Sequence, residues 1–358
     1  MVKIILNIIL IYTLSSQTVS AQYKVTDSVI SIGLLVNNNT SLAATNAAEL
    51  AIDIANKSED LIGRRFKLVT RSMEGPWGAG SKEAVNLVFN EKAWAILGSH
   101  DSRNAHLAEQ VIAKTKVVFL SAWASDPTLS QAYIPWFYNC VPNDIQQAEV
   151  LIKEIVKKEK FNKLAVITQE NYDAKKALKY VKEQIQSVST QDPYTSSFSF
   201  CTDSTEVFIK KLRDNAIETI VILGNQKQSW ELMSLLRKKE LKTPIFGTIS
   251  MLGAQDLSQL DPKHLSNLTV LNSGNWMKSN TLRFQNTADK SNIISNAIAA
   301  YAFDGINVII NAIKSSSFDR DKFYETISET NYNGVTGKIK FEKNGIRMNN
   351  LDLVKIAN

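Results

Sequence analysis

Residues 95–129 read AILGSHDSRNAHLAEQVIAKTKVVFLSAWASDPTL, and this stretch decides the fold. Its pattern predicts a buried strand that ends at Gly98, a polar turn, a helix of about three turns and a second strand. The turn holds His100, Asp101 and Ser102. A strand that leads into a helix leaves backbone N–H groups and the positive end of the helix dipole at one point, which favours a small anion. Two such loops side by side, SHDS and SAWAS, indicate a ligand cleft.

The alternation of strands and helices extends outward from this stretch. In the first half we expect strands at 29–35, 66–71, 94–98 and 117–121, with helices at 42–57, 81–92 and 104–115. After a proline-containing passage, the second half repeats the order, with helices at 144–160, 172–185, 204–214 and 228–241 and strands at 163–168, 196–200, 218–223 and 244–249. Asp144 is the predicted cap of the first of these helices, with Gln147 completing a capping box. Strands separated by helices predict α/β lobes with doubly wound parallel sheets.

The remaining residues are too few for a third domain of this kind. Their predicted elements, at 268–272, 294–314, 319–329 and 351–356, must complete sheets already begun. The chain therefore crosses between two lobes more than once, which makes a multi-strand hinge. We expect lobe 1 to comprise 22–141 and 271–346, and lobe 2 to comprise 142–270 and 347–358.

The N-terminus has the composition of a secretory signal. Lys3 precedes an apolar run at 4–14, and a small-x-small pattern ends at Ala21. We predict a cleaved signal peptide at 1–21 and a periplasmic protein. A membrane anchor is the alternative, although the apolar run is short for a span. No cysteine follows the run, so a lipoprotein anchor has no attachment point.

Charge and cysteine content narrow the possible partners. The chain of 358 residues carries a formal net charge of +6, and lysines cluster between 153 and 182 without the interleaved aromatics of a nucleic-acid surface. We therefore expect no nucleic-acid partner. A solvated face explains the lysines best, and docking to an acidic partner or a membrane surface is second. Cys140 and Cys201 permit one disulfide, but their spacing does not demand it.

Motifs for catalysis are missing from the sequence. The three histidines, His100, His106 and His264, form no HExxH or H-x-H pair. Three adjacent side chains on one turn cannot readily form a Ser-His-Asp relay. The glycine turn at 75–80 lacks the GK[ST] of a phosphate loop, so we interpret it as a tight turn with Trp77 at the cleft rim. We expect no enzyme activity, no metal and no cofactor.

The residues around the two loops suit a small solute. Ser102 is either an ordinary N-cap or a ligand-binding hydroxyl. Trp123, Ala124 and Ser125 follow the neighbouring strand and would face the same crevice. A hydroxyl, backbone N–H groups and an indole favour a ligand with a carboxylate and an apolar body. Tyr172 begins a helix after the first strand of lobe 2 and would close the other side.

The sequence resembles the type I periplasmic binding proteins, in particular the leucine/isoleucine/valine-binding branch that delivers solutes to ABC transporters. The resemblance rests on ISIGLLV, AIDIAN, the GSHDS…FLSAWASDPTL block, VPNDIQQA, AVITQENYDAKKAL and ELKTPIFG, in this order and spacing over most of the chain. It implies that two lobes close over a ligand. By position, Ser102 matches the family's carboxylate-binding serine, Ala124 and Ser125 its backbone and hydroxyl contacts, and Tyr172 its lobe 2 aromatic.

Two positions depart from that family. Ile249 stands where the amino-acid binders place an acid for the ligand ammonium, and Asn225 stands where they place a tyrosine. A buried ammonium without a carboxylate is costly, so the resemblance argues against an ordinary α-amino acid. We expect a monomer that binds a small-molecule ligand and partners an ABC transporter permease. The alternative is a periplasmic sensor or accessory protein for a larger ligand or a protein.

Overall fold

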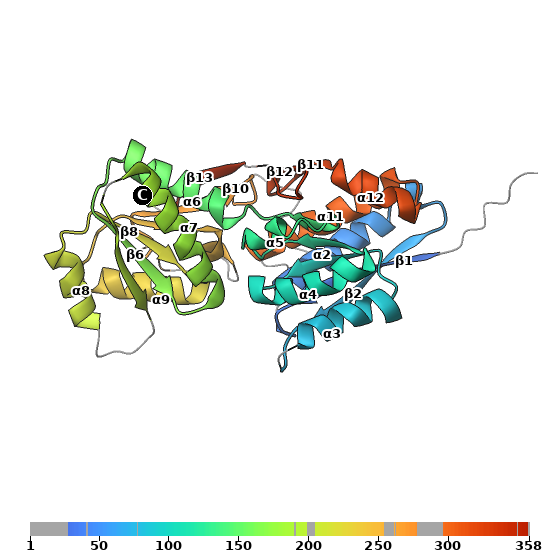
Figure 1. The fold of residues 1–358 in the computed structure, drawn as a ribbon, viewed down its shortest axis with the longest axis horizontal. Coiled ribbons are helices and arrows are strands. Elements are labelled where there is room, and N and C mark those ends of the chain that lie inside the picture. The colour runs from blue at the N-terminus through green and yellow to red at the C-terminus, as the bar shows by residue number, and fades with distance from the viewer. Residues whose placement is uncertain are drawn as a thin grey trace, which may run out of the picture.

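The computed structural model describes residues 28–356 except 41, 77, 190, 199–204, 254–260, 262, 278–295 and 349. Two α/β lobes lie side by side, as Figure 1 shows. The predicted signal peptide, Trp77 and Cys201 lie outside the described residues. Cys140 is a buried free thiol.

The first lobe is built on a five-stranded parallel sheet in the order β2-β1-β3-β4-β5. Successive residues of a strand point to opposite faces, and here each face is covered by helices. Leu34 and Leu97 pack in the cluster that includes α2 and α11, whereas Leu35 and Ile96 pack in the cluster that includes α4. The strands are β1 (Val29–Val36), β2 (Arg65–Ser72), β3 (Ala95–Ser99), β4 (Val118–Ser121) and β5 (Phe137–Asn139).

Helices of this lobe come from both ends of the chain. They are α2 (Leu42–Asn56), η1 (Glu59–Leu61), α3 (Ala79–Val85) with η2 (Asn86–Asn90), α4 (Ser102–Thr115), α5 (Thr128–Gln131), α11 (Ala297–Ser315) and α12 (Arg320–Ser328). Among the described residues, α11 is the helix whose length and apolarity could suit a membrane span, but 72% of its most apolar window is buried inside the protein. It packs against α2 as a core helix.

The second lobe contains a six-stranded sheet in the order β13-β10-β9-β8-β6-β7, parallel except for β13. Its strands are β6 (Leu164–Gln169), β7 (Tyr194–Phe198), β8 (Thr219–Leu223), β9 (Ile245–Gly247), β10 (Leu268–Ser273) and β13 (Leu351–Lys355). Its helices are α6 (Asp144–Ile152) with η3 (Lys153–Lys158), α7 (Tyr172–Val188), α8 (Thr205–Asp214), α9 (Gln226–Lys238) and η5 (Ile249–Leu252). The predicted fold class, two parallel-sheet α/β lobes, is confirmed.

Two helix starts differ from the prediction by one residue. Asn143, not Asp144, caps α6, and its capping-box partner is Gln146 rather than Gln147. Asp101, not Ser102, caps α4 by accepting a hydrogen bond from the Asn104 N–H at 2.9 Å. In both cases two adjacent residues have side chains suited to capping, and the backbone conformation selects the first of them.

The lobes are connected where three segments of the chain run together. Arg347, which is fully buried, donates hydrogen bonds to the carbonyl oxygens of Cys140 (2.7 Å) and Thr336 (2.6 Å). Thr336 belongs to the turn between β11 (Asn331–Gly334) and β12 (Gly337–Lys340), a hairpin that the sequence pattern did not predict. The buried carboxylate of Asp304 accepts from the Thr336 N–H and hydroxyl. This polar cluster therefore joins three segments: the one at Cys140, where the chain first passes to lobe 2, the hairpin at Thr336, and the one at Arg347, where the chain returns to lobe 2.

Candidate functional site

The site is formed where the carboxyl ends of strands from both sheets meet. In lobe 1 these strands are β3 and β4, which are hydrogen-bonded neighbours. Ser102 follows β3 as the first residue of α4 and is buried. Its hydroxyl accepts a hydrogen bond from the Asp126 N–H (3.3 Å) in the loop after β4. The two polar loops singled out in the sequence are therefore bonded to each other.

A small enclosed cavity of about 90 Å³ lies between the two lobes. Among the described residues that line it there are two carboxylates and no lysine, arginine or histidine. The lining residues come from the loop after β4, from α6, from the start of α7 and from the ends of β8 and β9: Trp123, Ser125, Val141, Asp144, Gln147, Asn171, Asp173, Ala174, Ala177, Leu223, Gly224, Asn225, Thr248, Ile249 and Ser250. We call it the inner cavity.

A wider and more open cavity of about 710 Å³ lies next to it. It is bounded by the glycine turn after β2, by the start of α4 and by the start of α7. Four residues line both cavities: Trp123, Asn171, Asp173 and Asn225. We call this second space the outer cavity, and it places the inner cavity within reach of the surface.

The side chain of Trp123 reaches across from lobe 1 to lobe 2. A Cβ atom added at Gly253 would lie 3.1 Å from Cζ2 of the Trp123 indole. Gly253 directly follows η5 of the second lobe. The indole therefore packs against the lobe 2 backbone, and it lines both cavities.

The polar walls of the inner cavity are held in place by hydrogen bonds within lobe 2. The Gln147 side chain accepts from the Ile249 N–H (3.1 Å) and donates to the Pro142 carbonyl oxygen (2.9 Å). The Ser250 hydroxyl donates to the Gly224 carbonyl oxygen (2.8 Å). Such fixed polar groups around an apolar wall can orient a small solute.

Asp173 crosses the cleft from lobe 2. It lies in the first turn of α7, and its Oδ1 accepts a hydrogen bond from the Ser102 N–H of lobe 1 at 3.1 Å. Burial raises the pKa of Asp173 to about 6, and the charges of Asp101 and Asp126 act in the same direction, whereas the bond from Ser102 opposes them. A carboxylate thus occupies the N-terminus of α4.

Asp126 makes the reverse crossing, from lobe 1 to lobe 2. Its Oδ2 lies 3.3 Å from the Tyr172 hydroxyl and 3.4 Å from the Lys176 Nζ, both on α7. On its own lobe it is bonded by His106 and by the Thr128 N–H. Burial alone would raise the pKa of Asp126, but these bonds and charges hold it well below the ordinary value.

The pKa values of two neighbouring groups, His106 and Asp144, are raised. Hydrogen bonds to Asp126 and Glu109 raise the pKa of His106 to about 9, so this imidazole is protonated at neutral pH. Inside the inner cavity, burial raises the pKa of Asp144 well above its ordinary value, and the charges of Asp173 and Asp126 add to this effect. Among the described residues, no group of three or more His, Cys, Asp or Glu side chains is placed to hold a metal ion.

The structure brings most of the predicted site residues together. Trp123, Ser125, Asn225 and Ile249 line the inner cavity, Tyr172 lines the outer one, and the Ser102 N–H bonds Asp173. Ala124 is buried and lines neither cavity; its carbonyl oxygen accepts from Ser121 and Asn139. Trp77 lies outside the described residues.

Sequence reasoning missed six polar residues of the inner cavity: Asp144, Gln147, Asn171, Asp173, Thr248 and Ser250. Asp144 and Gln147 were assigned a capping role, so they were not considered as residues of the ligand site. Asn171 is the N-cap of α7, accepting from the Ala174 N–H at 2.8 Å. Asp173 is adjacent to Tyr172, and that adjacency was the signal that could have revealed it.

Several solved structures share this fold over 92% of the chain. The branched-chain amino acid transporter substrate-binding protein LivJ of Streptococcus pneumoniae, in complex with isoleucine, has a TM-score of 0.77 at 17% identity, with 96% of that chain covered. The leucine-binding protein LivK of Thermotoga maritima has a TM-score of 0.77 at 18% identity, with 95% covered. An ABC-transporter solute-binding protein of Rhodopseudomonas palustris, in complex with 3,4-dihydroxybenzoic acid, has a TM-score of 0.79 at 14% identity, with 93% covered.

Sequence comparisons agree with the structural ones. A family model described as "Periplasmic binding protein" matches residues 30–358. Among curated proteins, glutamate receptor 2.2 of Arabidopsis thaliana is 23% identical over 158 residues, which are 44% of this chain and 17% of the receptor. Glutamate receptor 2.4 of the same plant is 24% identical over 225 residues, 60% of this chain and 24% of the receptor. The chain thus spans about a fifth of the length of these receptors.

Proposed function

The chain belongs to the periplasmic binding protein family, and from this premise we propose that it captures a small organic solute between its lobes and delivers it to an ABC permease. It acts by binding and lobe closure, as a monomer outside the cytoplasm after removal of the signal peptide at 1–21. The likeness to substrate-binding proteins of transporters supports this role.

The inner cavity is the observation that carries the proposal. It lies between the lobes, at the carboxyl ends of parallel strands, which is where open α/β sheets bind ligands. One side is an indole and the other presents amide and hydroxyl groups from Asn171, Asn225 and Ser250. A solute held there contacts both lobes at once, so its binding free energy favours the closed arrangement.

For the ligand we propose a molecule with a carboxylate and an apolar body. The N-terminus of α4 supplies the Ser102 N–H and a favourable dipole for the carboxylate, and Trp123 supplies an apolar surface. Isoleucine and 3,4-dihydroxybenzoic acid, the ligands named for two of the similar structures, both carry a carboxylate. Ser125, Tyr172, Asn225 and Ile249 complete the proposed site, and Ala124 and Trp77 keep their predicted roles as ligand-binding residues.

A thermal-shift screen tests the proposed site. The purified protein is heated with L-isoleucine, L-leucine, benzoate and 3,4-dihydroxybenzoate, and native mass spectrometry identifies any co-purified solute. A ligand at a hundred times its dissociation constant stabilises the protein by about 2.7 kcal/mol. Trp123→Ala should abolish the shift produced by the active compound.

Trp136→Ala is the matched control, because this indole packs on Tyr324 in lobe 1 and lines neither cavity. It should retain the ligand-induced shift. If Trp123→Ala and the wild type respond equally to the active compound, the inner cavity is not the site.

Delivery to a permease is tested by uptake. Cells that lack this protein should lose accumulation of the radiolabelled compound that the screen identifies, and expression of the wild-type chain should restore it. Unchanged uptake with a growth or signalling response to the compound would favour the sensor role instead.

A further inference from the structure

The N-terminus of α4 already holds an anion that belongs to the protein itself. The Ser102 N–H donates to Oδ1 of Asp173 at 3.1 Å, and the two residues are 71 positions apart in the chain. Ser102 is on lobe 1 and Asp173 is on lobe 2. The same carboxylate lines both the inner and the outer cavity.

An ordinary structural role for Asp173 does not account for this geometry. An acid in the first turn of a helix usually stabilises its own helix. Here α7 is capped by Asn171, whose side chain accepts from the Ala174 N–H. The carboxylate of Asp173 instead points across the cleft to the start of another helix.

We propose that Asp173 is an internal occupant of the anion site: its carboxylate holds the lobes together without ligand, and a ligand carboxylate binds by exchanging with it. The proposal rests on the proposed function. In it, the ligand carboxylate competes with the Asp173 side chain for the same N–H group. The strength of the Asp173 contact then determines how tightly a ligand carboxylate binds.

The charged groups around Asp173 make this contact exchangeable. Asp101 precedes α4, Asp126 follows β4 and Asp144 begins α6, and all three are acids. On its own helix, Lys176 and Tyr172 bond to Asp126 rather than to Asp173. Arg103 lines the outer cavity beside Asp173, and His106 lies behind Asp126. The charges that act on the pKa of Asp173 are those of Asp101 and Asp126, and both disfavour a further negative charge, so a second carboxylate enters most easily when Asp173 is neutral.

This gives the exchange a definite dependence on pH. Because burial raises the pKa of Asp173 to about 6, the side chain is largely protonated at pH 5 and ionised at pH 7.5. If exchange requires the protonated form, affinity for a carboxylate falls by on the order of 30-fold between these two pH values.

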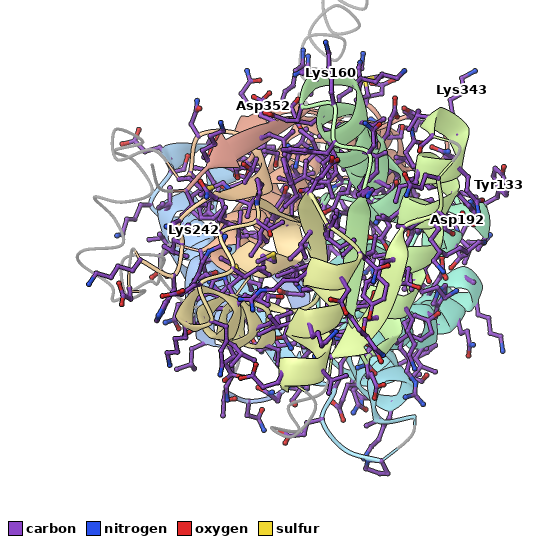
Figure 2. All side chains as sticks on the ribbon, turned by 90° about the vertical axis from the view of Figure 1, so that its left-hand side faces the viewer. Tyr133, Lys160, Asp192, Lys242, Lys343 and Asp352 are labelled. Atoms are coloured by element: carbon purple, nitrogen blue, oxygen red, sulfur yellow. The ribbon has the colours of Figure 1, made fainter. Side chains whose placement is uncertain are left out.

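The first measurement needs no ligand. Small-angle X-ray scattering of the ligand-free protein at pH 7.5 reports the separation of the lobes. The wild type should be compact, and Asp173→Asn and Asp173→Ala should have a larger radius of gyration. Asp192→Asn removes an equal charge at the periphery of lobe 2, where Figure 2 labels it, and should match the wild type.

The second measurement is calorimetric titration with benzoate at pH 5 and pH 7.5. The wild type should bind more tightly at pH 5, whereas Asp173→Asn should bind with the higher affinity at both pH values. Asp192→Asn should keep the pH dependence of the wild type.

The two measurements separate the possible failures. Lobe opening in the Asp173 variants, with no benzoate binding in any protein, supports the internal contact and overturns a benzoate-like carboxylate as the ligand. Equal scattering in all variants, or benzoate binding that is weakened in Asp173→Asn, overturns the internal occupant and leaves the solute-binding function standing.

Discussion

Two carboxylates cross the cleft in opposite directions, and their environments differ. Asp126 extends from lobe 1 to Tyr172 and Lys176 on lobe 2, and it is also bonded by His106 and Thr128 on its own lobe. Asp173 extends from lobe 2 to the Ser102 N–H of lobe 1. The pKa of Asp126 is lowered and that of Asp173 is raised to about 6.

The difference separates a contact whose charge does not change with pH from one whose charge does. Asp126 has cations on both sides, so it stays ionised and bonded over the whole physiological pH range. Asp173 lies among acids, and its desolvation is not repaid by a cation. The Asp126 contact therefore keeps its charge at every physiological pH, while the Asp173 contact changes with pH and is the one that a ligand carboxylate can replace.

The largest effect is expected from removing the Asp126 contact. Asp126→Asn removes the buried counter-charge of Lys176 and one of the two carboxylates bonded to His106, and this should lower the free energy of unfolding by about 3 kcal/mol. Urea unfolding followed by circular dichroism measures the change. The exposed pair Lys210–Asp214 provides the control, since Asp214→Asn should cost less than about 0.5 kcal/mol.

His106→Gln should give the next largest loss, about 2 kcal/mol at pH 6. The folded pKa of this histidine is raised to about 9, so its contribution is complete below the unfolded value near 6.5 and is lost as pH rises through 9. The unfolding curves of the variant and the wild type should differ at pH 6 and coincide at pH 9.5. A loss that is the same at both pH values would contradict a charged His106.

Lys176→Gln should cost about 1 kcal/mol, because this lysine is one-third exposed and Asp126 keeps its other partners. Thermal unfolding at low and high salt measures this contribution, which should shrink as salt is added. A loss as large as that of Asp126→Asn would mean that Lys176 alone carries the Asp126 contact.

Asp173→Asn should have the smallest effect on stability, within about 1 kcal/mol of the wild type at pH 7.5. A folded pKa above the unfolded one means that the wild type loses stability as pH rises from about 4 through 6, and the variant should lack this loss. Unfolding at pH 4 and pH 7.5 measures the difference. A cost near that of Asp126→Asn would erase the distinction between the two carboxylates.

Much of the fold was predictable, because apolar strands and amphipathic helices alternate in a local pattern. The short strand β5 and the β11–β12 hairpin were not, since three or four residues beside turn-forming neighbours carry little periodicity. Capping residues were displaced by one position at Asp101 and Asn143, where adjacent polar residues compete. Trp123 and Ser125, two of the predicted ligand-binding residues, line the inner cavity, and their binding role stays a prediction.

Apart from its position beside Tyr172, no local pattern singles out Asp173, and the reason is physical. Its partner is in the other lobe, so its role depends on how the lobes close and not on its own helix. From the sequence alone, an acid in the first turn of α7 is explained by its interaction with the dipole of its own helix. The other carboxylate that lines the cavity, Asp144, also comes from a position with a local explanation, since the sequence pattern assigned it a capping role.

The titration of Asp173 itself tests the central claim most directly. Carbon-13 NMR of aspartate carboxyl groups, with the Asp173 signal assigned from its loss in Asp173→Asn, gives the pKa of this side chain in the ligand-free protein. A pKa of about 6 is predicted for a carboxylate buried in the cleft on the Ser102 N–H. A pKa near 4, the value of an aspartate in water, would contradict the account by placing Asp173 outside the closed cleft.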